Sequence, residues 1–328
     1  MIKKKVFITG GAGYVGTVLV NELLNKGYLV TVYDLLIYGN TLPDKHANLK
    51  IVKGDVRNSS LLRKYIPGHD CLIHLACISN DPSFELNPKL GKEINLDAFE
   101  PLVKISRELN IKRFIYASSS SVYGIKNEND VHEDMSLEPL TDYSKFKAEC
   151  EKILFKYSNE DFITTIIRPA TVCGYSKRQR LDLVLNILTN LGYHKKEITI
   201  FGGSQFRPNI HIDDMVDVYI KLLEVENYKI NKQIYNVGFD NFTVGQLAIK
   251  VKEIIGNDIK LIYKKTNDMR SYHISSQKIK EQINFIPKKK LELAIIDLVK
   301  AFEKKLLKDP LNNNYYYNIK RMQNINLV

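Results

Sequence analysis

The segment TGGAGYVG, residues 9–16, lies between a short apolar run and a stretch with helical apolar spacing. Gly11, Gly13 and Gly16 fit the pattern GxGxxG, and Gly10, Gly13 and Gly16 fit GxxGxxG. Glycines at such a turn let backbone N–H groups and a helix N-terminus approach a pyrophosphate. A glycine triplet alone is weak evidence. Because this triplet lies between an expected strand and an expected helix, it indicates a dinucleotide-binding site.

Short apolar runs and helical stretches alternate along the first half of the chain. Apolar strands separated by helices are typical of a parallel sheet that is covered on both faces. We therefore expect an α/β fold, a Rossmann-like doubly wound parallel sheet, which binds ligands beyond the carboxyl ends of its strands. The expected strands are residues 6–9, 29–33, 50–52, 71–75, 114–117 and 164–167.

The alternation of strands and helices ends after Pro169, where helices and loops predominate. We expect these later elements to form a smaller C-terminal lobe that binds the substrate over the edge of the sheet. The last residues contain Asn-Asn-Asn and Tyr-Tyr-Tyr, which indicates a weakly ordered tail. The expected division is residues 1–172 with 213–240 for the dinucleotide-binding domain, 173–212 with 241–310 for the lobe, and 311–328 for the tail.

The composition is that of an ordinary globular protein. The chain has 328 residues, 44% of them hydrophobic and 26% charged, so two cooperating lobes suit its length. The formal charge of +11 would suit a nucleic acid, an anionic membrane or a phosphorylated ligand. The lysines are dispersed, so we expect no nucleic-acid partner. No stretch approaches the roughly 20 apolar residues that cross a bilayer. We expect no membrane partner and a cytoplasmic location.

Cysteine and histidine spacing gives no sign of a metal site or of a disulfide framework. Cys71, Cys77, Cys150 and Cys173 show no CxxC spacing and are sparse for disulfides. The seven histidines include no HExxH motif and no pair at ligand spacing. We expect reduced thiols that pack as small hydrophobic groups, and no metal site.

Asp34 follows Gly16 by 18 residues and stands at the end of the second expected strand. A carboxylate at that place accepts both ribose hydroxyls of NAD and repels the 2′-phosphate of NADP. No arginine follows it closely, so NAD is favoured as the cofactor. Asp55 and Val56, after the third strand, are placed to meet the adenine. A plain helix-capping or turn role for Asp34 is the alternative.

Tyr143 and Lys147 are four residues apart in the segment TDYSKFK, so they share one face of a helix. A lysine near a tyrosine, together with a nicotinamide cation, favours the phenolate and lowers the tyrosine pKa. Such a tyrosine can act as a general base on an alcohol, or as an acid in the reverse direction. The YxxxK pair is common by itself and becomes specific only with the glycine turn upstream.

Together these segments resemble the extended short-chain dehydrogenase/reductases, the NAD-dependent nucleotide-sugar epimerase/dehydratase family. The resemblance covers about residues 5–305 and implies a Rossmann-like fold, NAD as cofactor and a nucleoside-diphosphate sugar as substrate. We place the chain closer to the 4-epimerase and 4-dehydrogenase members than to the 4,6-dehydratases. The matching elements are TGGAGYVG, Asp34, GDV at 54–56, HLA at 74–76, SSSSVYG at 118–124, YSKFK at 143–147, RP at 168–169, RPNIH at 207–211 and NVG at 236–238.

The prediction of the reaction type depends on the four consecutive serines at 118–121. Counting back from Tyr123, the family's catalytic Ser/Thr falls on Ser119, which would hydrogen-bond the sugar hydroxyl that Tyr143 deprotonates. Dehydratases of the family carry acidic groups at Ser120 and Ser121, and its epimerising reductases carry a cysteine at Ser121. This chain has neither. The resemblance therefore favours oxidation at one carbon, C4 of a hexose or heptose, in surface polysaccharide synthesis.

The resemblance and the local sequence together imply a set of site residues. Catalytic roles fall on Ser119, Tyr143 and Lys147. The cofactor residues are Gly10, Gly13, Tyr14, Val15, Gly16, Asp34, Asp55, Val56, Leu75, Ala76, Tyr143, Lys147 and Pro169. The substrate residues are Ser79, Asn80, Ser120, Arg180, Arg207 and Arg270.

The substrate assignments leave alternatives open. Arg207 and Arg270 match family positions that hold a diphosphate, which arginine can bind through two hydrogen bonds, but a surface salt bridge would explain each. A plain turn would explain Ser79 and Asn80. The nucleotide is weakly expected to be GDP. In the family, helices equivalent to residues 91–109 and to the Tyr143 helix pair in a dimer, so a homodimer or larger homo-oligomer is expected.

Three functional alternatives remain. The same residues serve a 4-keto sugar reductase, because sequence does not report the direction of reaction. A 4,6-dehydratase of the same family is a second alternative. A non-catalytic protein that senses NAD(H) or binds RNA is a third, from another functional class. Loss of the tyrosine or lysine usually marks such a protein, and here Tyr143 and Lys147 are both present.

Overall fold

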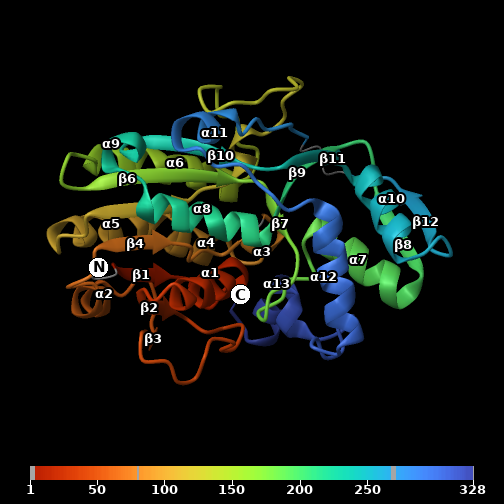
Figure 1. The fold of residues 1–328 in the computed structure, drawn as a ribbon, viewed down its shortest axis with the longest axis horizontal. Coiled ribbons are helices and arrows are strands. Elements are labelled where there is room, and N and C mark those ends of the chain that lie inside the picture. Colours follow the sequence, from red (N-terminus) through yellow and green to blue (C-terminus); the bar gives the residue numbers. More distant parts are fainter. Residues whose placement is uncertain (1–3, 80, 267–270, 328) are drawn as a thin grey trace.

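The computed structural model describes residues 4–79, 81–266 and 271–327. Asn80 and Arg270, both expected to bind substrate, lie outside the described residues. A seven-stranded sheet forms the centre of the molecule, in the order β10-β6-β5-β4-β1-β2-β3 (Figure 1). All its neighbouring strands are parallel, which confirms the doubly wound α/β fold. The strands are β1 (Lys5–Thr9), β2 (Leu29–Asp34), β3 (Leu49–Lys53), β4 (Cys71–His74), β5 (Arg113–Ala117), β6 (Ile163–Pro169) and β10 (Gln233–Val237).

The sheet is apolar on both faces because successive side chains of a strand point in opposite directions. In β1, Val6 and Ile8 belong to one hydrophobic cluster, whereas Phe7 belongs to the other. Helices α1 (Tyr14–Asn25) and α8 (Ile212–Glu224) contribute to the first cluster. The second contains side chains of α2 (Ser59–Tyr65), α5 (Phe99–Glu108) and α6 (Asp142–Tyr157). Helices therefore cover both faces of the sheet, as Figure 1 shows.

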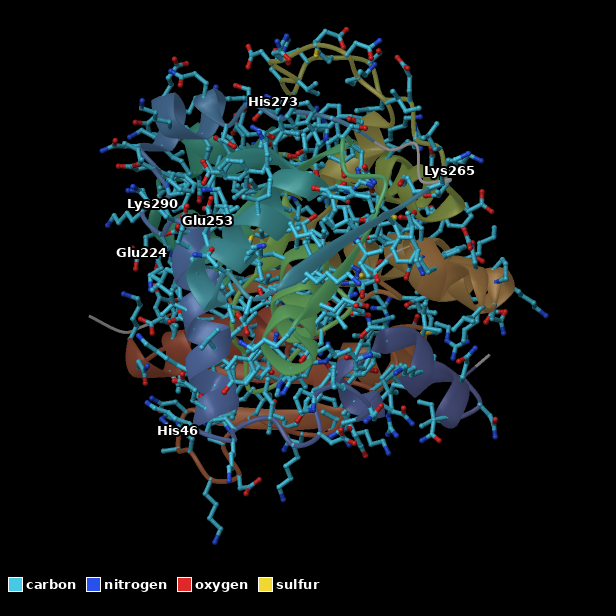
Figure 2. The ribbon with its side chains drawn as sticks, turned by 90° about the vertical axis from the view of Figure 1, so that its right-hand side faces the viewer. His46, Glu224, Glu253, Lys265, His273 and Lys290 are labelled. Atoms are coloured by element: carbon cyan, nitrogen blue, oxygen red, sulfur yellow. The ribbon has the colours of Figure 1, made fainter. Side chains whose placement is uncertain are left out.

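A smaller lobe lies beside the sheet and has its own hydrophobic cluster, which includes Leu188, Leu247 and Ile295. Its outer side carries exposed charged side chains of both signs, among them Glu253 and Lys290 (Figure 2). Its helices are α7 (Val184–Lys195), α10 (Val244–Ile255) and α12 (Leu291–Glu303). Its strands are β7 (Thr171–Cys173), β9 (Phe206–His211) and β11 (Asp240–Thr243) in one sheet, and β8 (Glu197–Phe201) and β12 (Lys260–Lys264) in another.

Short elements complete the chain. The loop after β4 contains the first three of these elements, and the last two lie in the C-terminal segment. None of the helices in the described part of the chain is long and apolar enough to span a bilayer. The short elements are α3 (Asp81–Glu85), α4 (Pro88–Lys92), a π-helical turn (Glu93–Asp97), a 3₁₀ turn (Ser120–Tyr123), α9 (Asn227–Ile230), α11 (Gln277–Ile283), a second 3₁₀ turn (Asn314–Tyr316) and α13 (Asn318–Asn324).

The C-terminal segment (residues 311–327) differs from the weakly ordered tail expected from its composition. It forms a 3₁₀ turn and helix α13 and packs back onto the protein (Figure 1). Met322 and Asn318 are each 1% exposed. The repeated asparagines and tyrosines that indicated disorder make specific contacts instead. For example, the Tyr317 hydroxyl donates to the Pro310 carbonyl at 2.8 Å and accepts from Asn190 at 3.0 Å.

A buried ion pair joins α6 to the end of β6. Arg168 donates through Nη2 to Glu151 Oε2 at 2.7 Å and through Nε to Oε1 at 3.0 Å. Both residues are 3% exposed or less. The Ser118 hydroxyl, just after β5, donates to the same carboxylate at 2.5 Å. This bidentate pair therefore fixes α6 against the carboxyl ends of two neighbouring strands.

We expect Arg168→Met to lower the free energy of unfolding by about 3–5 kcal/mol, because it leaves the Glu151 carboxylate buried without its partner. Urea unfolding at pH 7, followed by circular dichroism, measures the loss. Arg63→Met is the matched control, since its pair with Glu108 is about half exposed and should cost under about 1 kcal/mol. Similar losses in the two variants would show that the buried pair has no special role.

Candidate active site

A cavity of about 370 Å³ opens at the carboxyl ends of the sheet strands. Its walls come from the loops that follow β1, β2, β3, β4, β5 and β6, which is where doubly wound sheets bind ligands. Every residue expected to bind the cofactor lines this cavity except Asp55. Ser119, Tyr143 and Lys147 line it as well. The structure therefore brings the expected cofactor and catalytic residues together in one place.

The glycine turn allows the backbone to approach closely. Gly10 has a φ of +75°, and a Cβ atom there would lie 2.5 Å from the backbone nitrogen of Ala76. A Cβ atom on Gly16 would lie 2.6 Å from the carbonyl oxygen of Gly10. Helix α1 begins at Tyr14, so its N-terminus points into the cavity beside this turn. Such a backbone cradle fits the pyrophosphate of a dinucleotide.

Asp34 ends β2 at the wall of the same cavity. Its carboxylate accepts hydrogen bonds from the backbone nitrogens of Ala12 at 3.0 Å and Leu36 at 2.8 Å. Burial raises the pKa of Asp34, whereas these two hydrogen bonds and the charge of Arg178 act to lower it. The carboxylate is thus held in place beside the glycine turn, where it fits the adenosine ribose of NAD.

Asp55 is placed differently from the expectation that it meets the adenine. Its carboxylate lies 2.7 Å from Arg57, and its carbonyl accepts from the Tyr33 hydroxyl at 2.7 Å. It does not line the described cavity wall, whereas Gly54 and Val56 do. The Arg57 guanidinium, two residues further along the chain, holds the side chain away from the cavity.

Helix α6 presents Tyr143 and Lys147 to the cavity. Thr141 caps this helix by accepting from the backbone nitrogen of Ser144 at 3.3 Å. Lys147 Nζ donates to the carbonyl of Ala117 at 2.6 Å and lies 5.8 Å from the centre of the Tyr143 ring. The lysine is therefore fixed to the end of β5, close to the ring of Tyr143.

Several groups of the protein act on the pKa of Tyr143. Burial raises this pKa well above its ordinary value, and the charge of Asp81 contributes to the rise. The charge of Arg180 and a hydrogen bond to Ser119 act in the opposite direction. Ser119 and Arg180 therefore favour the phenolate form, and Asp81 opposes it.

Two of the serines at 118–121, Ser119 and Ser121, belong to a chain of hydroxyl groups. Ser119 and Ser121 are 2.8 Å apart, and Ser144 donates to Ser121 at 2.9 Å. Ser144 lies 3.0 Å from Thr141, which donates in turn to Asp81. All four serines line the cavity, and Ser118 also donates to Glu151.

The expected substrate residues divide into two groups. Ser79, Ser120 and Arg180 line the cavity. Arg207 does not, and its Nη1 donates to the carbonyl of Phe206 at 3.0 Å. The diphosphate role expected for Arg207 is therefore not supported by its position.

Several residues that line the cavity had no specific role assigned from the sequence. Asp81 is the first residue of α3, in the loop after β4, and lines the cavity. Arg178 stacks its guanidinium 3.7 Å above the ring of Tyr38, from the loop after β2. Arg178 and Arg180 stand two residues apart in one loop. The remaining missed residues include Tyr38, Met215, Tyr219, Tyr272 and Leu327.

Residues 6–238 match the model of the NAD dependent epimerase/dehydratase family. An uncharacterized UDP-glucose epimerase of Bacillus subtilis is 31% identical over 271 residues, 78% of this chain and 84% of the relative. A dTDP-D-glucose 4,6-dehydratase of Dictyostelium discoideum is 29% identical over 276 residues, 76% of this chain. That alignment spans 62% of the Dictyostelium protein. An uncharacterized protein of Sinorhizobium fredii is 30% identical, and its alignment with this chain spans 63% of its length.

Solved structures agree with this assignment. A UDP-glucose 4-epimerase from Thermotoga maritima, solved with UDP-glucose, has a TM-score of 0.84 and 26% identity over 92% of this chain and 100% of its own. The family match covers well over half of the chain and includes the glycine turn, Asp34 and the Tyr143–Lys147 pair. The chain belongs to the NAD-dependent epimerase/dehydratase family of nucleotide-sugar enzymes.

Proposed function

We propose that this protein is a nucleotide-sugar 4-epimerase, which oxidises C4 of a nucleoside-diphosphate hexose and then reduces the same carbon from the other face. The observation that carries the proposal is the meeting of Ser119, Tyr143 and Lys147 with the glycine turn and Asp34 in one cavity. The relatives named as UDP-glucose epimerases support UDP as the nucleotide, in place of the GDP weakly expected from the sequence.

Tyr143 is placed to remove the proton of the sugar 4-hydroxyl. Ser119 hydrogen-bonds the same phenol and can hold the sugar oxygen beside it. Lys147, fixed on the Ala117 carbonyl, keeps a cation near the phenolate. NAD, held by the glycine turn and Asp34, would supply the acceptor and donor of the C4 hydride. In an epimerase the proton and hydride both come back to the sugar, so no net oxidation occurs.

Oxidation without dehydration is favoured by the positions of Ser120 and Ser121. Both are buried, 2% and 7% exposed, and neither supplies a carboxyl group. We extend the proposal, on the family resemblance, to a homodimer that pairs α5 and α6 and to a role in surface polysaccharide synthesis. A 4-dehydrogenase that releases the keto sugar would use the same residues.

A 4,6-dehydratase is the second candidate, because Asp81 supplies an acidic group that the sequence at 120–121 lacks. Asp81 is 6% exposed, lines the cavity and acts on the pKa of Tyr143. The dTDP-D-glucose 4,6-dehydratase among the relatives is consistent with this reading. A carboxyl group near the sugar could assist the loss of water from C5 and C6.

We expect the purified protein with NAD to convert a UDP-hexose to a product of unchanged mass and new retention time. Mass spectrometry of a panel of UDP-, GDP-, dTDP- and CDP-sugars measures this. Tyr143→Phe should lower the rate by about 10²–10⁴-fold, because the general base is lost. Tyr228→Phe is the matched control, since that tyrosine is 77% exposed and its loss should leave the rate unchanged.

Other outcomes of the panel are decisive. Loss of two hydrogens would identify a 4-dehydrogenase, and loss of water would identify the dehydratase. If Tyr143→Phe keeps the full rate, the assignment of the base is wrong. If no sugar changes while NAD(H) stays bound, the protein is a binding member of the family and not an enzyme.

The pH dependence of kcat/KM should shift in opposite directions in two variants. Ser119→Ala removes a hydrogen bond that lowers the pKa of Tyr143, so the rising limb of the profile should move to higher pH. Asp81→Asn removes a charge that raises the same pKa, so the limb should move to lower pH. Asp142→Asn is the control, because Asp142 is exposed on the first turn of α6. Shifts in the same direction would contradict the assigned contacts.

A further inference from the structure

Two buried arginines share one wall of the cavity. Arg178 and Arg180 lie in the loop between β7 and α7 and are 4% and 8% exposed. Arg178 faces the cofactor side, where it stacks on Tyr38 and its charge acts on Asp34. Arg180 faces the catalytic side, where its charge acts on Tyr143. The loop thus places one cation beside each end of the cavity.

The two cations differ in how far nearby negative charge compensates them. Arg180 pairs with Asp182, with Nε 2.9 Å from Oδ1, whereas Arg178 has only neutral acceptors within hydrogen-bond distance among the described residues. Arg178 Nε and Arg180 Nη2 are buried without a hydrogen-bond partner among the described residues. Burial lowers the pKa of Arg178 to about 10, which reflects the cost of a cation placed there. A buried positive site of this kind favours an anionic ligand.

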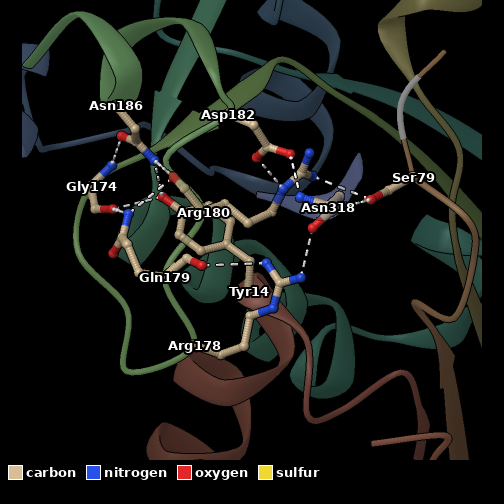
Figure 3. A network of polar contacts seen from close by, with 9 residues as sticks. All are labelled: Tyr14, Ser79, Gly174, Arg178, Gln179, Arg180, Asp182, Asn186 and Asn318. Atoms are coloured by element: carbon tan, nitrogen blue, oxygen red, sulfur yellow. Dashed lines mark hydrogen bonds and ion pairs between the residues drawn. The ribbon is translucent and has the colours of Figure 1, made fainter. Parts of the chain in front are cut away.

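Asn318 connects the groups that hold both arginines (Figure 3). Its Oδ1 accepts from Arg178 Nη2 at 2.7 Å, and its Nδ2 donates to the Ser79 hydroxyl at 3.0 Å. Its backbone nitrogen donates to Asp182 Oδ2 at 3.0 Å, on the carboxylate that pairs with Arg180. Ser79 also accepts from Arg180 Nη1 at 3.3 Å. A single residue therefore fixes Arg178 directly and Arg180 through two partners, Ser79 and Asp182.

The rest of the C-terminal segment anchors Asn318 across the mouth of the cavity. The carbonyl of Tyr316 accepts from the backbone nitrogen of Leu181 at 2.9 Å, beside the arginine loop. Arg321 Nε donates to the carbonyl of Ile37 at 2.6 Å, in the loop after β2. Leu327 lines the cavity itself. The segment thus joins the loops that follow β2, β4 and β7.

We propose that Arg178 and Arg180 bind the anionic phosphate groups of the bound ligands, and that Asn318 of the C-terminal segment is the positioning residue for this anion site. The inference rests on the proposed nucleotide-sugar site. The phosphate can come from NAD or from the nucleotide sugar. The position of Arg178 near Asp34 favours the cofactor, and that of Arg180 near Tyr143 favours the substrate.

Asn318→Ala tests the positioning role through binding. We expect about tenfold weaker binding, the order that corresponds to losing one hydrogen bond to a charged group. Calorimetry with UDP and GDP measures the substrate arm, and the NAD content that remains after gel filtration measures the cofactor arm. Gln323→Ala is the matched control, because Gln323 is exposed on the same helix. Unchanged binding in both arms, in a variant with the wild-type circular dichroism spectrum, would overturn the inference.

A double-mutant cycle separates positioning from general stability. If Asn318 acts through Arg178, Asn318→Ala should weaken binding little further in an Arg178→Met background. Fully additive losses would contradict this. The effect of Asn318→Ala on turnover should also appear in KM more than in kcat.

If Asn318→Ala fails to fold, Asn318→Asp tests the same inference. The aspartate has the same shape and supplies a negative charge beside Arg178, so it should keep the melting temperature while weakening phosphate binding. Undiminished phosphate binding by this variant would overturn the inference. These binding readouts do not depend on turnover. A panel without any sugar product would therefore defeat the proposed function alone.

Discussion

The buried pair between Glu151 and Arg168 is the interaction on which the active site depends. A carboxylate and a guanidinium that are removed from water are costly unless each has its full set of partners, and here Ser118, Tyr123 and the Glu133 carbonyl complete the set. Glu151 stands four residues after Lys147 and eight after Tyr143, so all three share one side of α6. Fixing Glu151 against the ends of β5 and β6 therefore also sets the distance of the catalytic tyrosine from Ser119.

The cofactor side of the cavity is held together by close backbone contacts and not by a buried ion pair. Gly10 brings the turn after β1 so close to Ala76, after β4, that a single Cβ atom would overlap it. Asp34 is then held by backbone N–H groups from the turn after β1 and from its own loop after β2. Because these contacts join neighbouring strand ends, the dinucleotide site follows directly from the order of strands in the sheet. The catalytic side instead needs a helix fixed by side-chain contacts.

The sequence was sufficient to predict features encoded by local pattern. The glycine turn, Asp34 and the Tyr143–Lys147 spacing each lie within one strand–turn–helix unit, and the strand runs predicted the parallel sheet. Asp81, Arg178 and Asn318 could not be predicted in the same way, since their roles arise from contacts between segments far apart in the chain. Asn318 is 239 residues from Ser79, with which it shares a hydrogen bond. Composition was also misleading for the C-terminal segment, because tertiary contacts order asparagines and tyrosines that have no helical pattern.

Arg180 links the proposed binding of the ligand to the pKa of Tyr143. Its charge lowers the pKa of Tyr143, and its guanidinium also lines the wall where we place the anion site. An anion bound there offsets part of that charge, so its effect on the phenol weakens as the site fills. Asp182, which Asn318 holds in place, balances Arg180 before a ligand arrives. If the anion site and the general-base role of Tyr143 are as proposed, the C-terminal segment influences the acidity of Tyr143 as well as ligand binding, through Asn318, Asp182 and Arg180.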